Sequence, residues 1–69
     1  MPPKIRQLKA QLRSAGFSSQ SGNGSHTVWT HPLVPEATVT LSGKDGADAD
    51  KYQLKDVRDA LRKLREVQQ

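Results

Sequence analysis

The feature that most constrains this chain is an apolar stripe near its C-terminal end. Apolar residues recur there every three or four positions, at Leu54, Val57, Ala60, Leu61, Leu64 and Val67. This spacing places them on one side of an α-helix, which must bury that side against the rest of the chain. Residues 50–53 predict a capping box at its start, with Asp50 as the acceptor. On the opposite side, Asp59 is expected to pair with Lys63 and Arg62 with Glu66.

A second helical stripe lies near the N-terminus and predicts a helix over residues 4–15. Its apolar members are Ile5, Leu8, Leu12 and Ala15. Pro3 suits the first helical position, and Gly16 suits the left-handed residue that ends a helix. Phe17 is then expected to fold back on Leu12. The basic residues of this segment, Lys4, Arg6, Lys9 and Arg13, lie off the stripe.

Three strands are predicted between the helices, over residues 17–21, 26–31 and 38–42. The first two flank residues 22–25, and their Asn-Gly pair is the strongest short signal for a hairpin turn. A two-residue turn there places His26 opposite Ser21. The order α-β-β-β-α predicts an α+β fold in which two helices cover one face of a three-stranded antiparallel sheet. Double-stranded-RNA-binding domains have this layout.

Side chains on a strand alternate between its two faces. If Trp29 faces the helices as core, Thr27 and His31 do so too, and His26, Val28 and Thr30 line the open face. His31 lies five residues from His26, roughly 17 Å along a strand and on the opposite face. We therefore expect His31 to be a structural strand end rather than a second catalytic group.

Composition limits the function classes open to the chain. Its 69 residues suffice for a single domain (residues 1–69), and a hydrophobic content of 33% leaves no deep cavity for an organic cofactor. Cysteine is absent from the sequence, which excludes disulfides and thiol catalysis. The acidic segment 43–50 lacks the spacing of a calcium loop, so no metal site is expected. With no apolar run long enough for a signal peptide or a membrane span, we expect a soluble, cytoplasmic protein.

Positive charge is concentrated in the first half of the sequence. The net charge is +4; residues 1–35 carry four basic residues and no acid, while residues 36–69 carry seven of each sign. A one-sided positive field attracts polyanions, of which nucleic acid is the commonest in a cytoplasm. The alternative is a solvated helix face that only keeps the protein soluble.

His26 follows a glycine-rich turn, which is suited to phosphate recognition. Gly22 and Gly24 allow close approach of another backbone, turn amides can bind phosphate oxygens, and Ser25 adds a hydroxyl donor. Imidazole exchanges a proton near neutral pH and can act as a general base. RNA supplies its own nucleophile, the 2′-hydroxyl, which DNA lacks. The group that protonates the leaving 5′-oxygen stays open among water, His26 itself and a nearby lysine.

The sequence resembles the HicA (YcfA-like) toxin family over nearly its whole length. The resemblance rests on AGF at residues 15–17, GxGSH at 22–26, HP at 31–32, TVTLSGKDGADA at 38–49 and YQxKxVRxAL at 52–61. It implies a fold similar to the double-stranded-RNA-binding domain, ribonuclease activity on messenger RNA and a HicB-type antitoxin that covers the active surface. The family's essential histidine falls on His26. Asn23 stands where many relatives have lysine or arginine, which weakens RNA binding at the turn.

Three hypotheses follow. The first is the toxin of a type II toxin–antitoxin system, a metal-independent endoribonuclease with His26 as the general base. Its RNA-binding residues are Gly22, Asn23, Gly24, Ser25, Lys4, Arg6, Lys9 and Arg13. The second is a non-catalytic RNA-binding module with the same basic surface. The third is an interaction protein whose basic surface binds an acidic protein. The oligomeric state stays open.

Overall fold

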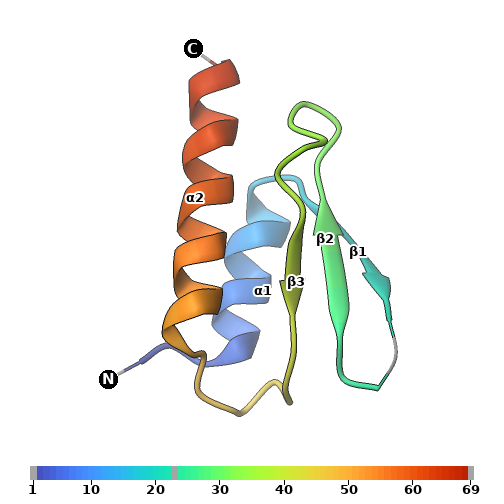
Figure 1. The fold of residues 1–69 in the computed structure, drawn as a ribbon, viewed down its shortest axis with the longest axis vertical. Helices are drawn as coiled ribbons and strands as arrows, with labels where there is room; N and C mark the ends of the chain where they lie inside the picture. The colour runs from blue at the N-terminus through green and yellow to red at the C-terminus, as the bar shows by residue number, and fades with distance from the viewer. Residues whose placement is uncertain (1, 23, 69) are drawn as a thin grey trace.

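The computed structural model describes residues 2–22 and 24–68. Figure 1 shows five elements in the predicted order α-β-β-β-α. They are α1 (Ile5–Ser14), β1 (Ser18–Ser21), β2 (Thr27–Thr30), β3 (Val39–Leu41) and α2 (Lys51–Gln68). Each predicted element is present, with ends that differ by one or two residues. The α+β fold class is confirmed.

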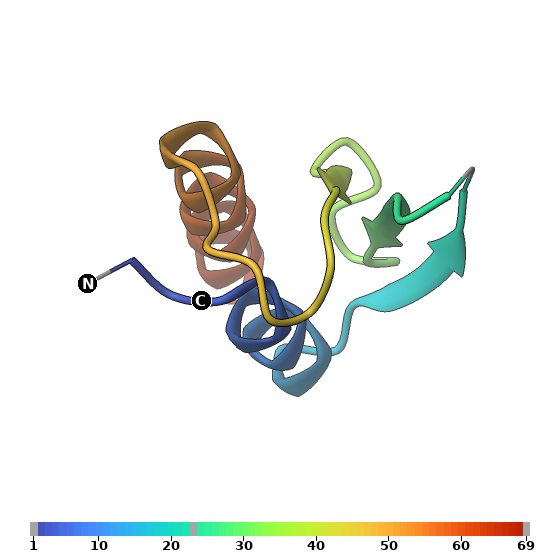
Figure 2. The ribbon, with the colours of Figure 1, turned by 90° about the horizontal axis from the view of Figure 1, so that it is seen from below.

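The three strands form one antiparallel sheet in the order β1-β2-β3. Thr27 of β2 pairs with Ser21 of β1 on one side and with Leu41 of β3 on the other. Both helices lie on the same side of this sheet (Figures 1 and 2). Trp29 is buried on that side, whereas Thr30 is exposed. The predicted alternation along β2 is therefore confirmed, and the other face of the sheet is open.

One hydrophobic core lies between the helices and the sheet. It comprises Ile5, Leu8, Leu12, Phe17, Trp29, Val34, Ala37, Val39, Leu41, Ala49, Val57, Ala60 and Leu64. Both predicted helical stripes contribute to it. Val67, the last member of the C-terminal stripe, is 52% exposed and lies outside the core. The prediction for Val67 was wrong because α2 extends beyond the end of the sheet that it covers (Figure 1).

The C-terminal end of α1 has the predicted glycine cap. Gly16 has φ of +97° and donates its N–H to the carbonyl of Arg13 at 3.0 Å. The N–H of Phe17 reaches the carbonyl of Leu12 at 3.0 Å. These two hydrogen bonds make a Schellman motif, which turns the chain so that Phe17 joins Leu12 in the core.

The N-terminal end of α1 is capped both by its own residues and by the acidic segment. Gln7 Oε1 accepts the N–H of Lys4 at 2.6 Å, and the carbonyl of Lys4 accepts the N–H of Gln7 at 2.9 Å. The N–H of Ile5 donates to the carbonyl of Ala47 at 2.9 Å, and that of Arg6 to the carbonyl of Asp45 at 3.1 Å. These bonds satisfy amides that a helix leaves without internal partners. Pro3 precedes the helix, which begins at Ile5, so its predicted place in the first turn was wrong. Its carbonyl accepts the N–H of Ala49 at 2.9 Å.

Asp50 caps α2 as predicted, but the Gln53 side chain does not complete the predicted capping box, and the surface ion pairs differ from those predicted. Asp50 Oδ1 accepts the N–H of Gln53 at 2.8 Å, and Gln53 Oε1 accepts the N–H of Ser42 at 3.2 Å. Asp59 pairs with Lys55 at 2.8 Å and approaches Arg62 at 3.7 Å, in place of the predicted pairs Asp59–Lys63 and Arg62–Glu66. The pair Lys55–Asp59 has the same four-residue spacing, so the spacing rule alone did not identify the partner. In residues 2–22 and 24–68, no helix is long and apolar enough to cross a membrane.

Candidate functional site

The His26 turn lies between the end of β1 at Ser21 and the start of β2 at Thr27. The N–H of Gly22 donates to the carbonyl of His26 at 2.8 Å, which continues the β1–β2 ladder by one pair. His26 therefore lies opposite Gly22, and the predicted pairing with Ser21 was wrong by one residue. All four residues of β1 are exposed and polar, so no apolar pattern in that strand fixed the register. Asn23, which we predicted in the turn and in RNA binding, lies outside the described residues.

His26 is exposed at the start of β2. Because Trp29 faces the helices, strand alternation directs His26 to the open face of the sheet. Gly22 leaves room beside it: a Cβ built on Gly22 would lie 3.4 Å from His26 Cβ. Gly24 has φ of +62°, which favours glycine there. The two glycines thus shape an open turn around an accessible imidazole.

Ser25 ties this turn to the segment after β3. Its Oγ accepts the N–H of Gly43 at 3.2 Å. Lys44, an exposed residue, directly follows Gly43 and therefore lies beside this hydrogen bond. The site residues predicted from the sequence did not include Lys44. The strand order β1-β2-β3 could have predicted its position. In an antiparallel pair, the residues that follow the end of β3 lie beside those that precede the start of β2.

The predicted basic residues of α1 are distributed over several environments. Lys4 Nζ forms an ion pair with Asp48 Oδ1 at 2.5 Å, and Lys9 Nζ with Asp45 Oδ1 at 2.7 Å. The hydrogen bond from Lys9 lowers the pKa of the Asp45 carboxyl below its usual value of 3.8, and the charge of Lys9 adds to this effect. The Arg13 guanidinium carbon lies 5.3 Å from the centre of the Trp29 ring, within cation–π range.

A concave basic surface lies at the N-terminal end of α1. It encloses about 430 Å³ and is lined by Pro2, Pro3, Lys4, Arg6 and Gln7. Both helices lie on one side of the sheet (Figure 2). Trp29 is buried on that side, and alternation directs His26 to the other side. The structure therefore does not gather the α1 cations and the imidazole on one face. Residues 43–48 connect them, through Ser25 at one end and Lys4 and Lys9 at the other.

His31 is held in the structural role that the sequence predicted. Its ring is 8% exposed and meets the Phe17 ring edge-on, with 5.1 Å between centroids. Its Nδ1 accepts the N–H of Leu33 at 3.1 Å. A Cβ built on Gly16 would lie 3.0 Å from His31 Nε2. Packed on these sides, the ring is unavailable to a substrate on the open face.

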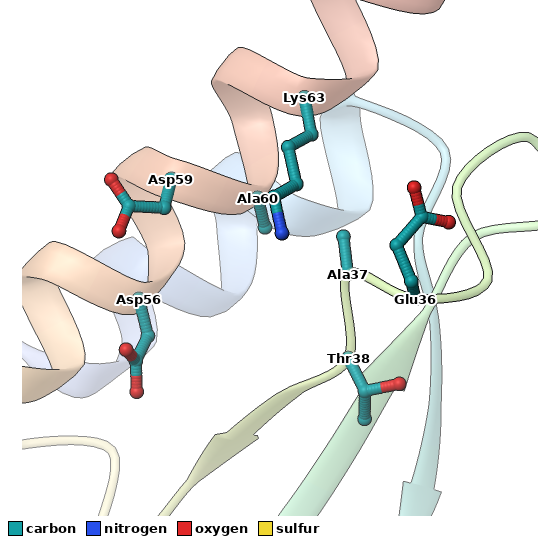
Figure 3. A pocket seen from close by; sticks show the side chains of 7 residues that line it. All are labelled: Glu36, Ala37, Thr38, Asp56, Asp59, Ala60 and Lys63. Carbon is teal, nitrogen blue, oxygen red and sulfur yellow. The ribbon is translucent and has the colours of Figure 1, made fainter.

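A hollow of about 220 Å³ lies between α2 and the segment that enters β3 (Figure 3). It is lined by Glu36, Ala37, Thr38, Asp56, Asp59, Ala60 and Lys63. Three of these side chains are acidic, which disfavours a polyanion there. By the β2–β3 register, the hollow lies at the opposite end of the sheet from His26. In the described part of the chain, no three His, Cys, Asp or Glu side chains gather as a metal-binding group.

Fold and site together define a small α+β protein with an exposed histidine on a glycine turn and a basic N-terminal helix. The family model described as HicA toxin of bacterial toxin-antitoxin matches residues 5–66. The chain belongs to the HicA toxin family, and membership in a toxin–antitoxin family implies an antitoxin partner. Neither the curated proteins nor the solved structures gave a match.

Proposed function

We propose that this toxin is an endoribonuclease that cleaves messenger RNA, with His26 as its general base. HicA toxins are generally mRNA interferases. The observation that carries the proposal is the exposure of His26 on a glycine-flanked turn in a chain of this family. His31, the other histidine, is packed in the interior and leaves His26 as the imidazole that reaches solvent.

The chemistry uses a nucleophile that RNA carries. His26 removes the proton from a 2′-hydroxyl, and the 2′-oxygen attacks the adjacent phosphorus. The bond to the 5′-oxygen breaks, and that oxygen takes up a proton. The products are a 2′,3′-cyclic phosphate and a 5′-hydroxyl end. A positioned general base contributes about a hundred- to ten-thousand-fold in rate.

The RNA backbone meets positive charge at two places. Lys4 and Arg6 line the concave surface at the start of α1, and Lys44 follows the Gly43–Ser25 contact beside the His26 turn. Lys44 supplies the positive charge near the turn that Asn23 does not. Arg13 and Lys9 extend the basic surface along α1, and the amides of Gly24 and Ser25 serve as phosphate donors at the turn, since the Gly22 amide is bonded to the His26 carbonyl.

The decisive experiment compares purified wild type with His26→Ala on a single-stranded RNA, in the presence of EDTA. We expect wild type to leave 2′,3′-cyclic phosphate ends, detected by mass spectrometry, and His26→Ala to be slower by at least about a hundredfold. The same sequence with 2′-O-methyl groups, and its DNA counterpart, should stay intact.

Gln20→Ala is the matched control, because Gln20 is also exposed and lies on the neighbouring strand β1. It should cleave at the wild-type rate. A folded His26→Ala variant that cleaves as fast as wild type would remove His26 from the mechanism. Loss of cleavage in EDTA alone would contradict the metal-independent step.

A second candidate, an RNA-binding toxin that does not cleave, is favoured by one observation. Both helices lie on one side of the sheet (Figure 2), and strand alternation directs His26 to the other side, so a strand held on α1 does not reach the imidazole directly. This candidate predicts that His26→Ala arrests growth as wild type does. Charge reversal at Arg6 and Arg13 would abolish the arrest.

We further propose that the antitoxin is of the HicB type and acts in the cytoplasm. It covers both the His26 turn and the basic surface of α1, because covering both blocks substrate and general base together. Co-expression of a HicB-type antitoxin should suppress RNA cleavage, and the complex should protect α1 and the turn from hydrogen exchange. Protection confined to the acidic hollow beside α2 would contradict this binding mode.

A further inference from the structure

The acidic segment, residues 43–50, contacts residues 3–9 at the start of the basic helix through both backbone and side-chain groups. Its carbonyl groups cap α1 at Ile5 and Arg6. Its carboxylates hold the ammonium groups of Lys4 and Lys9, which are 44 and 36 residues away in sequence. At its other end, Gly43 is bound to Ser25 of the His26 turn.

The two ion pairs engage the same atoms that an RNA backbone would use. A lysine ammonium binds a carboxylate and a phosphate oxygen through the same N–H donors. Asp48 and Asp45 remain 56% and 64% exposed in their pairs, so an RNA strand at α1 meets both carboxylates from solvent. While each ion pair is formed, the aspartate carboxylate occupies the position beside the lysine where an RNA phosphate would bind.

We propose that the acidic segment acts as an internal competitor of RNA, in which Asp45 and Asp48 occupy Lys9 and Lys4 until a phosphate backbone displaces them. This inference rests on the proposed binding of RNA by α1. The competition lowers affinity for any short polyanion and favours strands that make several phosphate contacts at once. Asp45 and Asp48 thereby make RNA binding depend on the number of phosphate contacts a strand makes, although they contact the lysines and not the RNA.

The pairs are weak enough to be displaced. Exposed ion pairs each shift an equilibrium by up to about fivefold. The two pairs together therefore reduce the affinity of α1 for RNA but do not prevent RNA from binding there. The cap on α1 is unaffected when the carboxylates leave, because the capping acceptors are the backbone carbonyls of Asp45 and Ala47. Displacement therefore requires only side-chain rotation and leaves the helix in place.

The test uses the full chain and a short single-stranded RNA with 2′-O-methyl groups, which binds without being cleaved by the proposed chemistry. The variant Asp45→Asn/Asp48→Asn removes both competing charges and keeps side-chain size. Its matched control, Asp56→Asn/Glu66→Gln, removes two exposed acids of α2 and raises the net charge by the same amount. Dissociation constants are measured by fluorescence anisotropy at several salt concentrations.

We expect the acidic-segment variant to bind about tenfold more tightly than wild type at low salt, and the control less than about threefold. In a Lys4→Gln/Lys9→Gln background, the Asp substitutions should tighten binding no more than the control substitutions do. Equal tightening in the variant and the control, with binding by wild type intact, would overturn this inference alone. Absence of RNA binding in all proteins would overturn RNA binding by α1 and this inference with it.

Discussion

The packing of His31 against Gly16 leads to the most demanding prediction, which concerns Gly16→Ala. The substitution adds a single Cβ. That atom would lie 3.0 Å from His31 Nε2 and 3.4 Å from His31 Cδ2. The ring cannot easily withdraw, because Phe17 packs against it and the N–H of Leu33 is bonded to it.

Two costs combine at this position. Alanine in a left-handed conformation costs about 1–2 kcal/mol, and an extra carbon in a packed site costs about 1–3 kcal/mol. We therefore expect Gly16→Ala to lower the free energy of unfolding by about 2–5 kcal/mol. A chain of this size has roughly 3–10 kcal/mol in total. The melting temperature should fall by about 8–40 °C.

Gly24→Ala is the matched control. Gly24 also has positive φ, at +62°, but a Cβ built there meets nothing within 4 Å. It should cost about 1–2 kcal/mol, the conformational part alone. Urea unfolding followed by the fluorescence of Trp29, the one tryptophan in the sequence and 1% exposed, measures both variants.

A double-mutant cycle with His31→Ala isolates the contact. Removing the ring should reduce the cost of Gly16→Ala by about 1–2 kcal/mol, since the added Cβ then has space. If Gly16→Ala is no more destabilising than Gly24→Ala, or if its cost is the same without the His31 ring, the account of His31 as a packed structural residue is refuted.

Three further predictions concern the cap of α2, the core and the Ser25 tie. The N–H of Gln53 lowers the pKa of the Asp50 carboxyl below 3.8, so its contribution to stability is present above that pH and is lost as the pH falls through the lower, folded value. Acid titration of urea unfolding should therefore show the advantage of wild type over Asp50→Asn disappearing below pH 3.8, and a constant difference would contradict it. Leu12→Ala, at a side chain that is 0% exposed, should cost about 2–5 kcal/mol in urea unfolding and reduce toxicity through lost folded protein; a stable variant would contradict the packing. Ser25→Ala should lower kcat several-fold with the fold intact, and Ser25→Thr should restore it; equal activity in all three proteins would show that the tie to Gly43 does not position His26.

The fold could be predicted well from the sequence because its signals are local. Apolar spacing indicated both helices, Gly16 indicated the end of α1, and Trp29 as core fixed the two faces of β2. The same alternation predicted that His31 is interior and His26 exposed. The register of β1 could not be predicted, since a strand that is polar on both faces packs equally well in either register. The one-residue error at Ser21 follows directly from this.

The site was harder to predict because its connections are long-range. Nothing in the sequence around Lys9 indicates that it pairs with Asp45, and an acidic loop with glycines is typical of a solvated linker. The contact of Ser25 with Gly43 depends on how the end of β3 lies beside the start of β2. Lys44 was missed for the same reason: it is adjacent to the His26 turn in space but lies 18 residues after His26 in the chain.

The charge pattern shows why position in the chain is a poor guide to the field around the molecule. The first half of the sequence carries four basic residues and no acid, and the second half is balanced. Folding brings Asp45 and Asp48 from the second half onto Lys9 and Lys4 of the first, so half of that excess is locally neutralised. The positive field then rests on Arg6 and Arg13, which form no ion pair with a carboxylate of the described residues, and on Lys44 beside the turn. On the proposed binding of RNA by α1, the phosphates therefore first contact these arginines. They reach Lys4 and Lys9 only when Asp48 and Asp45 are displaced, so the acidic segment lowers the affinity that the two lysines contribute.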